Sequence, residues 1–119
     1  MIAFASRTGN VRYIVSKLNG EVLEISPNLV IERPFLLVTY TDGLGDIPKP
    51  VEQFLKDNHT FCKGVVVSGN RNFGHHVFAG AADKIAISYA IPLVRKIDLR
   101  GFTADIEEIQ RYYDEQVNV

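Results

Sequence analysis

The feature that most constrains this chain is the alternation of short apolar runs with segments whose apolar residues recur at helical spacing. Four runs are rich in β-branched or aromatic residues and end near Gly, Pro, Asn or Ser: 1–5, 35–40, 64–68 and 91–94. Because these runs are almost continuously apolar, they predict strands buried on both faces, as in a parallel sheet. A weaker run, 21–25, predicts an edge strand.

Between the strands, apolar residues recur three or four positions apart, which predicts four helices. Asn10 stands at the N-cap position of the first helix, and Pro48 and Pro50 suit the first turn of the second. The last helix is expected to start near Thr103, with Glu107 as its capping partner. The apolar positions that mark the four helices are Val11, Ile14, Val15 and Leu18; Val51, Phe54 and Leu55; Phe78, Ala81, Ala82, Ile85 and Tyr89; and Ile106, Ile109 and Tyr113.

Strands that alternate with helices predict an α/β fold: a doubly wound, five-stranded parallel sheet with helices on both faces. The expected strand order is 2-1-3-4-5, which places a topological switch point between the first and third strands, where ligands of such folds bind. We expect residues 1–119 to form a single domain, because two domains within 119 residues would each be near the lower size limit.

The charge balance excludes some classes of partner. With 13 Lys and Arg against 14 Asp and Glu, the net charge is −1, so no overall field attracts the protein to nucleic acid or to anionic lipid. No apolar run is long enough to span a bilayer, and the first residues lack the pattern of a signal peptide. We therefore expect a cytoplasmic protein that binds neither nucleic acid nor membrane.

The loop after the first strand is a candidate anion site. It contains Ser6, Thr8, Gly9 and Asn10 and leads into the first helix, whose free N–H groups attract phosphate. Gly9 lets the backbone turn closely around such a group. Taken alone, the same residues are also typical of a simple helix cap.

The loop after the third strand is the second candidate. Its glycines Gly43 and Gly45 flank Leu44, so the backbone can approach a flat ligand and change conformation at low cost. A tight strand-to-helix turn is an equally good interpretation of this stretch by itself.

The loop after the fourth strand, residues 68–74, is the third candidate. Asn70 and Asn72 can form hydrogen bonds with the edge of a planar ring, and Phe73 offers a stacking face. An aromatic residue between Asn and Gly is hard to explain as core, which favours a binding role. All three loops follow strands that end at one edge of the sheet.

These residues resemble the flavodoxin-like NrdI family, which serves the class Ib ribonucleotide reductase system. The most specific segments are Ser-Gly-Asn-Arg-Asn-Phe-Gly at 68–74 and Ala-Gly-Ala-Ala-Asp-Lys-Ile at 79–85, supported by 6–11 and 38–45. The segment 99–103 is also similar to the family, but Phe102 and Thr103 depart from its usual Gly-Thr order. The resemblance covers nearly the full chain.

The resemblance implies FMN as cofactor and the radical-bearing small subunit NrdF as partner. In this family, FMN reduced by a flavin or thiol-pathway reductant is understood to reduce O2 and to deliver the oxidant, superoxide or peroxide, to the dimanganese site of NrdF, assisting assembly of its tyrosyl radical. No side chain is assigned as a catalytic acid or base, or as a metal ligand. The residues that the resemblance assigns to FMN are Ser6, Thr8, Gly9, Asn10, Val11, Thr41, Asp42, Gly43, Leu44, Gly45, Ser68, Gly69, Asn70, Asn72, Phe73 and Gly74.

Two departures bear on the flavin. Relatives often carry an aromatic residue in place of Leu44 and a neutral residue in place of Asp42. A carboxylate near the ring disfavours a negatively charged reduced flavin, unless Asp42 points to water. His75 and His76 adjoin the third loop, but adjacent side chains diverge, so a two-histidine metal site is not expected.

Two alternatives stay open. A conventional flavodoxin electron carrier typically surrounds its flavin with acidic residues, whereas Arg7, Arg12 and Arg71 flank this site. A non-catalytic α/β interaction domain is the other alternative. A response-regulator receiver is disfavoured, because Ala5, Ser6 and Tyr40 stand where it would need acidic residues.

Overall fold

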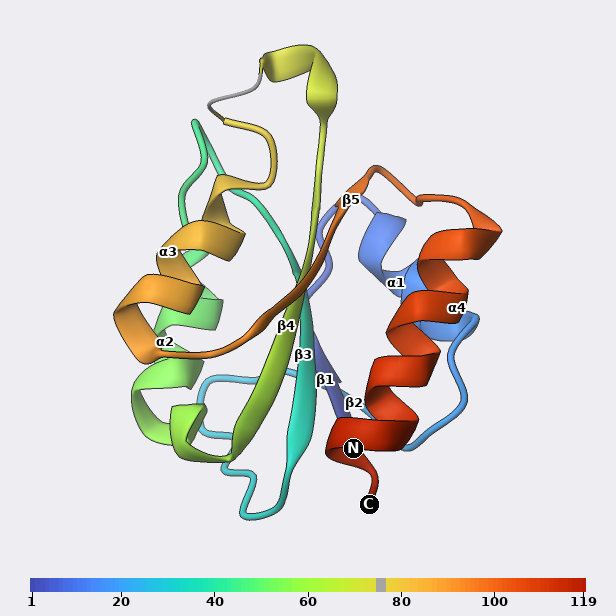
Figure 1. Ribbon diagram of the computed structural model, residues 1–119. Coiled ribbons are helices and arrows are strands. Elements are labelled where there is room, and N and C mark those ends of the chain that lie inside the picture. Colours follow the sequence, from blue (N-terminus) through green and yellow to red (C-terminus); the bar gives the residue numbers. More distant parts are fainter. Residues whose placement is uncertain (75–76) are drawn as a thin grey trace.

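The computed structural model describes residues 1–74 and 77–119 (Figure 1). It contains a parallel sheet with the strand order β2-β1-β3-β4-β5, which confirms the predicted topology. The strands are β1 (Ile2–Phe4), β2 (Val22–Glu24), β3 (Phe35–Tyr40), β4 (Cys62–Gly69) and β5 (Leu93–Asp98). The helices are α1 (Asn10–Ser16), α2 (Lys49–Asn58), α3 (Gly80–Tyr89) and α4 (Thr103–Tyr112), with shorter helical turns at His59–Phe61, Arg71–Phe73 and Tyr113–Val117.

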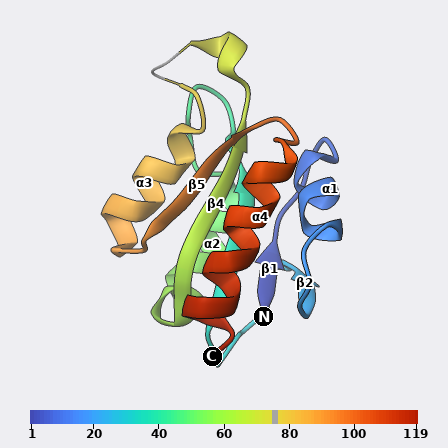
Figure 2. The same cartoon turned by 45° about the vertical axis from the view of Figure 1, so that its right-hand side comes forward.

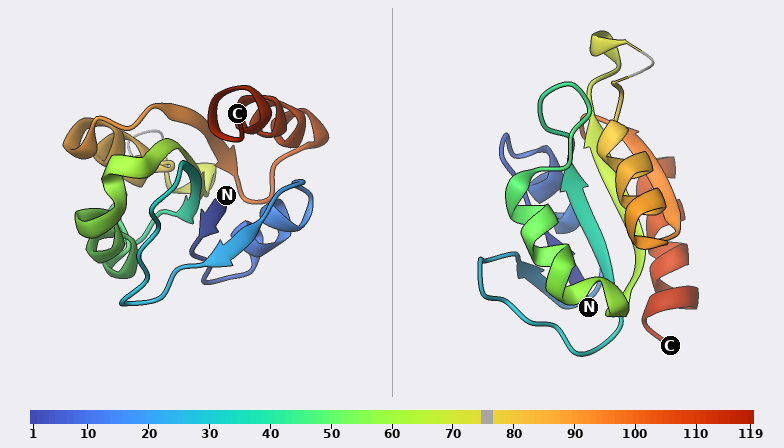
Figure 3. Two further views of the ribbon diagram at one scale, coloured as in Figure 1. Left: turned by 90° about the horizontal axis from the view of Figure 1, so that it is seen from below. Right: turned by 90° about the vertical axis from the view of Figure 1, so that its left-hand side faces the viewer.

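The sheet lies between two helical layers. Helices α2 and α3 cover one face and α1 and α4 cover the other (Figures 1 and 2), and the view along the strands in Figure 3 shows the same three layers. Strand β3 shows why both faces are apolar: Phe35 and Leu37 pack toward α2 and α3, whereas Leu36 and Val38 pack toward α1 and α4. All four side chains are fully buried, as expected when side chains alternate between two covered faces.

The last strand was predicted too early in the chain. The apolar run 91–94 predicted a strand buried on both faces, whereas β5 runs from Leu93 to Asp98 and is mostly half-buried. Its place at the edge of the sheet agrees with the predicted strand order. An edge strand tolerates polar residues, and Arg95 and Lys96 pair in register with Val66 and Val67 of β4. A continuous apolar run therefore predicts the position of the central strands well and the position of this edge strand poorly.

Two predicted helix caps are also wrong. Gly9, not Asn10, occupies the N-cap of α1, because the backbone there has a left-handed φ of 95° that suits glycine. At the start of α4, the Oδ2 atom of Asp105 accepts a hydrogen bond from the N–H of Phe102 at 2.7 Å, whereas Glu107 is exposed. Pro48 and Pro50 begin α2 as predicted.

Because β1, β3 and β4 are parallel, the loops that follow them gather at one end of the molecule, at the top of Figure 1. The chain termini lie at the other end. Among residues 1–74 and 77–119, no helix has the length and apolar character needed to cross a membrane.

Candidate functional site

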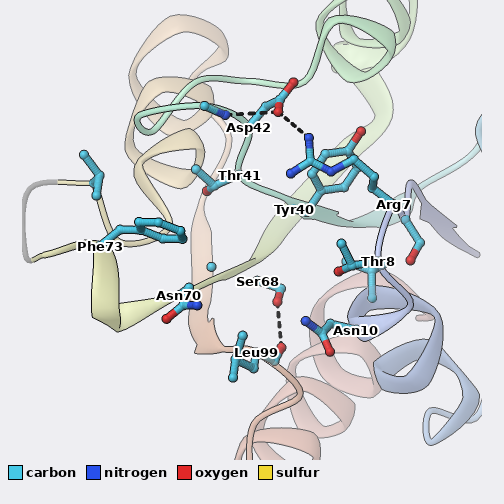
Figure 4. Close-up of a pocket in the computed structure, with 15 residues that line it drawn as sticks. Arg7, Thr8, Asn10, Tyr40, Thr41, Asp42, Ser68, Asn70, Phe73 and Leu99 are labelled. Carbon is cyan, nitrogen blue, oxygen red and sulfur yellow. Dashed lines mark hydrogen bonds and ion pairs between the residues drawn. The ribbon is translucent and has the colours of Figure 1, made fainter.

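A cavity of about 610 Å³ opens at the carboxyl ends of β1, β3 and β4 (Figure 4). It lies at the switch point between β1 and β3, the usual ligand position in a doubly wound sheet. Three loops and the turn after β5 contribute its lining, which consists of Ser6, Arg7, Thr8, Asn10, Val11, Tyr40, Thr41, Asp42, Gly43, Ser68, Gly69, Asn70, Phe73, Val77 and Leu99.

The structure brings most of the predicted site residues together. Those that line the cavity are Ser6, Thr8, Asn10, Val11, Thr41, Asp42, Gly43, Ser68, Gly69, Asn70 and Phe73. The remaining predicted residues belong to the same loops but are not part of the lining: Gly9, Leu44, Gly45, Asn72 and Gly74. Both histidines at 75 and 76 lie outside the described residues.

The residues outside the lining shape the loops instead. The N–H of Asn72 donates to Oδ1 of Asn70 at 2.9 Å, and Gly74 ends the short helical turn with a φ of 99°. Gly45 packs against the start of α3: a Cβ on Gly80 would lie 2.9 Å from the Cα of Gly45. Leu44, at the tip of its loop, is 78% exposed.

Four lining residues were not predicted. Arg7 and Tyr40 stand inside or beside the loops that the sequence singled out, so their position in the chain was a usable signal. Leu99 begins the segment 99–103 that resembles the family, but nothing in the sequence placed it at the cavity, and Val77 carried no signal. Leu99 reaches the cavity only because β5 lies next to β4, where Ser68 Oγ donates to the Leu99 carbonyl at 2.6 Å.

The first loop combines a buried anchor with exposed polar groups. Val11 is 1% exposed and fixes the start of α1 in the core, while Ser6 Oγ accepts a hydrogen bond from the N–H of Arg12 at 3.3 Å. The side chains of Thr8 and Asn10 lie on the opposite side of the cavity from Phe73 (Figure 4). Polar donors at one end and an aromatic face at the other suit a ligand with a charged end and a flat end.

Hydrogen bonds close the second loop into a small, well-defined unit. Asp42 and Asp46 form an antiparallel bridge through two hydrogen bonds, at 2.9 and 2.7 Å. Thr41 ties this unit to its neighbours, because its N–H donates to Ser68 O at 3.0 Å and its Oγ1 accepts from the N–H of Ala81 at 3.4 Å. The loop is thus connected to both β4 and α3.

An ion pair joins the first and second loops across the cavity. The guanidinium of Arg7 donates to Oδ1 of Asp42 at 2.6 Å and lies over the ring of Tyr40, 5.1 Å from its centroid. Figure 4 shows this pair above the cavity. The negative charge of Asp42 is therefore compensated locally by Arg7.

The arginines thought to give the rim a positive charge differ in their surroundings. Arg7 pairs with Asp42, and Arg12 pairs with Glu24 at 2.9 Å. Arg71 instead lies over the ring of Phe78 at 4.8 Å. Two of the three charges are thus neutralised by carboxylates, and the rim is less positive than the sequence suggested.

The third loop leaves β4 through a close contact that requires glycine. A Cβ on Gly69 would lie 2.6 Å from the backbone nitrogen of Ala79. Beyond it, the N–H of Arg71 donates to Oδ1 of Asp98 at 3.0 Å, and Phe73 is 70% exposed. The structure thus presents an aromatic ring to solvent beside the cavity, where it contributes little to the core.

The fold and the position of the cavity define a flavodoxin-like protein. A short-chain flavodoxin associated with a PDU bacterial microcompartment has a TM-score of 0.68 at 21% identity, with 95% of this chain and 92% of that chain covered. A flavodoxin of Fusobacterium nucleatum bound to flavin mononucleotide has a TM-score of 0.54 at 15% identity, with 96% and 93% covered. At these identities the likeness shows the fold.

The sequence identifies the family more narrowly. The family described as "NrdI Flavodoxin like" matches residues 2–111. "Protein NrdI" of Bacillus licheniformis is 40% identical over 107 residues, which are 89% of this chain and 81% of that protein. The chain therefore belongs to the NrdI flavodoxin-like family, as the motifs had suggested, and this membership implies a role in the class Ib ribonucleotide reductase system.

Proposed function

We propose that this protein binds FMN in the cavity at the β1/β3 switch point and serves the small subunit NrdF of a class Ib ribonucleotide reductase. When bound, FMN would supply the redox chemistry by which electrons from a flavin or thiol-pathway reductant reduce O2 to superoxide or peroxide for the dimanganese site, which would assist formation of the tyrosyl radical. The observation that carries the proposal is the convergence of three loops on one cavity in a chain of this family.

The cavity fits such a ligand in size and in the chemistry of its lining. Its volume, about 610 Å³, lies in the range of small-molecule sites, about 300–1,000 Å³. Thr8 and Asn10 offer polar groups on one side, and Phe73 offers an aromatic face on the other (Figure 4). A ligand with a phosphate at one end and a planar ring at the other matches this arrangement.

Each loop then has a defined task. Backbone N–H groups of 6–10, with Ser6, Thr8 and Asn10, would hold the phosphate. Residues 41–45 would border one edge of the ring, while 68–74 would cover its other side, where the Oδ1 of Asn70 already accepts from Asn72 and leaves the amide nitrogen to donate to a ring carbonyl.

The surface around the cavity suits a protein partner. Leu44 and Phe73, on two loops beside the cavity, are 78% and 70% exposed. Exposed apolar side chains next to a functional cavity are typical of protein–protein contacts. A partner that covers this region would receive a diffusible oxidant without its loss to solvent.

The test of cofactor binding compares two exposed phenylalanines. We expect protein mixed with FMN and then separated from free flavin to retain a flavin visible spectrum. We expect Phe73→Ala to weaken FMN binding about fivefold, as loss of a stacking contact of roughly 0.5–1.5 kcal/mol predicts. Phe102→Ala is the matched control, since Phe102 is 80% exposed and lies outside the cavity lining. A wild-type protein that takes up no FMN would overturn the proposal.

The test of the partner uses the reduced, FMN-loaded protein. Together with O2 it should generate the tyrosyl radical in manganese-loaded NrdF, measured by electron paramagnetic resonance. If the loaded protein instead reacts slowly with O2 and yields no radical, a conventional electron carrier is the better assignment. A protein that is colourless after incubation with FMN and removal of free flavin would favour a non-catalytic interaction domain.

A further inference from the structure

The turn after β5 brings a second cation to the first loop. Arg100 lies 90 positions from Asn10 in the chain, yet its Nε donates to Oδ1 of Asn10 at 3.3 Å. Its guanidinium also lies over the ring of Tyr13, 4.8 Å from the centroid. Among residues 1–74 and 77–119, no carboxylate forms an ion pair with Arg100.

The backbone beside Arg100 is strained and firmly held. Leu99 has a φ of 56°, a left-handed conformation that is uncommon for a non-glycine residue. Two hydrogen bonds to the end of β4 hold it there: Leu99 N–H donates to Gly69 O at 2.8 Å, and Ser68 Oγ donates to Leu99 O at 2.6 Å. Strain that the surroundings enforce is often found at functional sites. Here it points Leu99 toward the cavity and leaves Arg100 beside Asn10.

The hydrogen bond from Arg100 fixes the orientation of the Asn10 amide. Because Oδ1 accepts from a cation, the amide nitrogen is turned to the other side, and Figure 4 shows this nitrogen on the side of the cavity. An Asn side chain held this way presents its two N–H donors to the cavity and keeps its acceptor away from it. That orientation suits an anion and disfavours a cation.

We propose that Arg100 is a positioning residue for the phosphate end of the ligand, acting through Asn10. It orients the Asn10 amide so that its N–H groups donate to the phosphate, and its interaction with Tyr13 holds the guanidinium in place for this task. The inference rests on the proposed function, since it assigns the phosphate of FMN to the first loop.

The test compares FMN with riboflavin, which has the same ring and no phosphate. Dissociation constants of both are measured by quenching of flavin fluorescence for the wild type, Arg100→Met and Lys17→Met. Lys17 is the matched control, because its Nζ also lies over Tyr13, at 5.3 Å, but its side chain forms no hydrogen bond with Asn10 like that of Arg100. We expect Arg100→Met to weaken FMN binding about tenfold, the size of one charge-assisted hydrogen bond, with riboflavin binding unchanged and Lys17→Met near wild type.

Asn10→Ala distinguishes action through Asn10 from a direct contact with the phosphate. In that background, adding Arg100→Met should weaken FMN binding less than twofold. A full tenfold loss there, an equal loss of FMN and riboflavin, or no loss from Arg100→Met alone would each overturn the proposal. If the wild type bound neither flavin, the proposed function itself would fail, which is a distinguishable result.

Discussion

The side chains of Arg7 and Asp42 meet at 2.6 Å although 35 positions separate them in the chain. Each lies on a different loop of the cavity, so the ion pair joins the loop expected to hold a phosphate to the loop expected to border the ring. Both side chains are about half exposed, and water therefore screens their interaction. We expect this ion pair to change mainly the electrostatic potential at the bound ligand and to contribute little to the stability of the fold.

The two members of this pair should tune the midpoint potential of bound FMN in opposite directions. Reduction adds negative charge to the site, so Arg7→Met should lower the potential and Asp42→Asn should raise it, each by about 30 mV, roughly 1.4 kcal/mol for two electrons. The double variant should lie near the wild type. Spectroelectrochemical titration measures all three, and shifts of the same sign would contradict this account.

The contact between Gly45 and Gly80 should be sensitive to a single methyl group. A Cβ on Gly80 would lie 2.9 Å from Gly45 Cα and 3.0 Å from its carbonyl oxygen. Both are backbone atoms, so Gly80→Ala should lower the free energy of unfolding by about 1–3 kcal/mol, as overpacking does. Urea titration tests this, with Ser88→Ala on the exposed side of α3 as a control expected to change little.

The N-terminal cap of α4 should depend on pH through Asp105. Burial alone would raise the pKa of this carboxyl, but the hydrogen bond from Phe102 N–H and the pairing with Arg95 at 2.5 Å outweigh burial and lower it. A lowered pKa in the folded state gives stability that is fully present above the ordinary value of 3.8 and is lost as the pH falls below that value and through the lowered pKa. We expect Asp105→Ala to destabilise the protein by about 1–2 kcal/mol at pH 7 and by much less near pH 3. An equal loss at both pH values would argue against this role.

Burial should make the Cys62 thiol unreactive. It should also make the stability of the folded protein depend on pH. Burial raises the pKa of this thiol from 9.0 to about 12, so it stays protonated at pH 8 and should react with Ellman's reagent only after unfolding in urea. Because the pKa of Cys62 is raised in the folded state, the contribution of this buried thiol to stability is fully present below pH 9 and is lost as the pH rises toward 12. The difference in stability between wild type and Cys62→Ala should therefore shrink above pH 9. Rapid labelling of the folded protein would contradict this expectation.

Much of the architecture followed from local patterns. The apolar runs that became β1, β3 and β4 are continuous because helices cover both faces of the central strands. Pro48 and Pro50 began α2 as expected, since proline suits a first helical turn. The pattern failed for β5, because Arg95 and Lys96 lie within the strand and interrupt its apolar run.

The features of the site also fall into those that the sequence determined and those that only the tertiary structure decided. The sequence by itself determined which loops carry glycine, asparagine and an exposed aromatic ring, because these residue types are intrinsic to turns that must approach a ligand. Only the tertiary structure decided that Arg7 would neutralise Asp42 and that Arg100 would reach Asn10. Contacts across 35 and 90 positions depend on the conformations of the loops and on a strained turn at Leu99, and neither leaves a periodic signal in the chain.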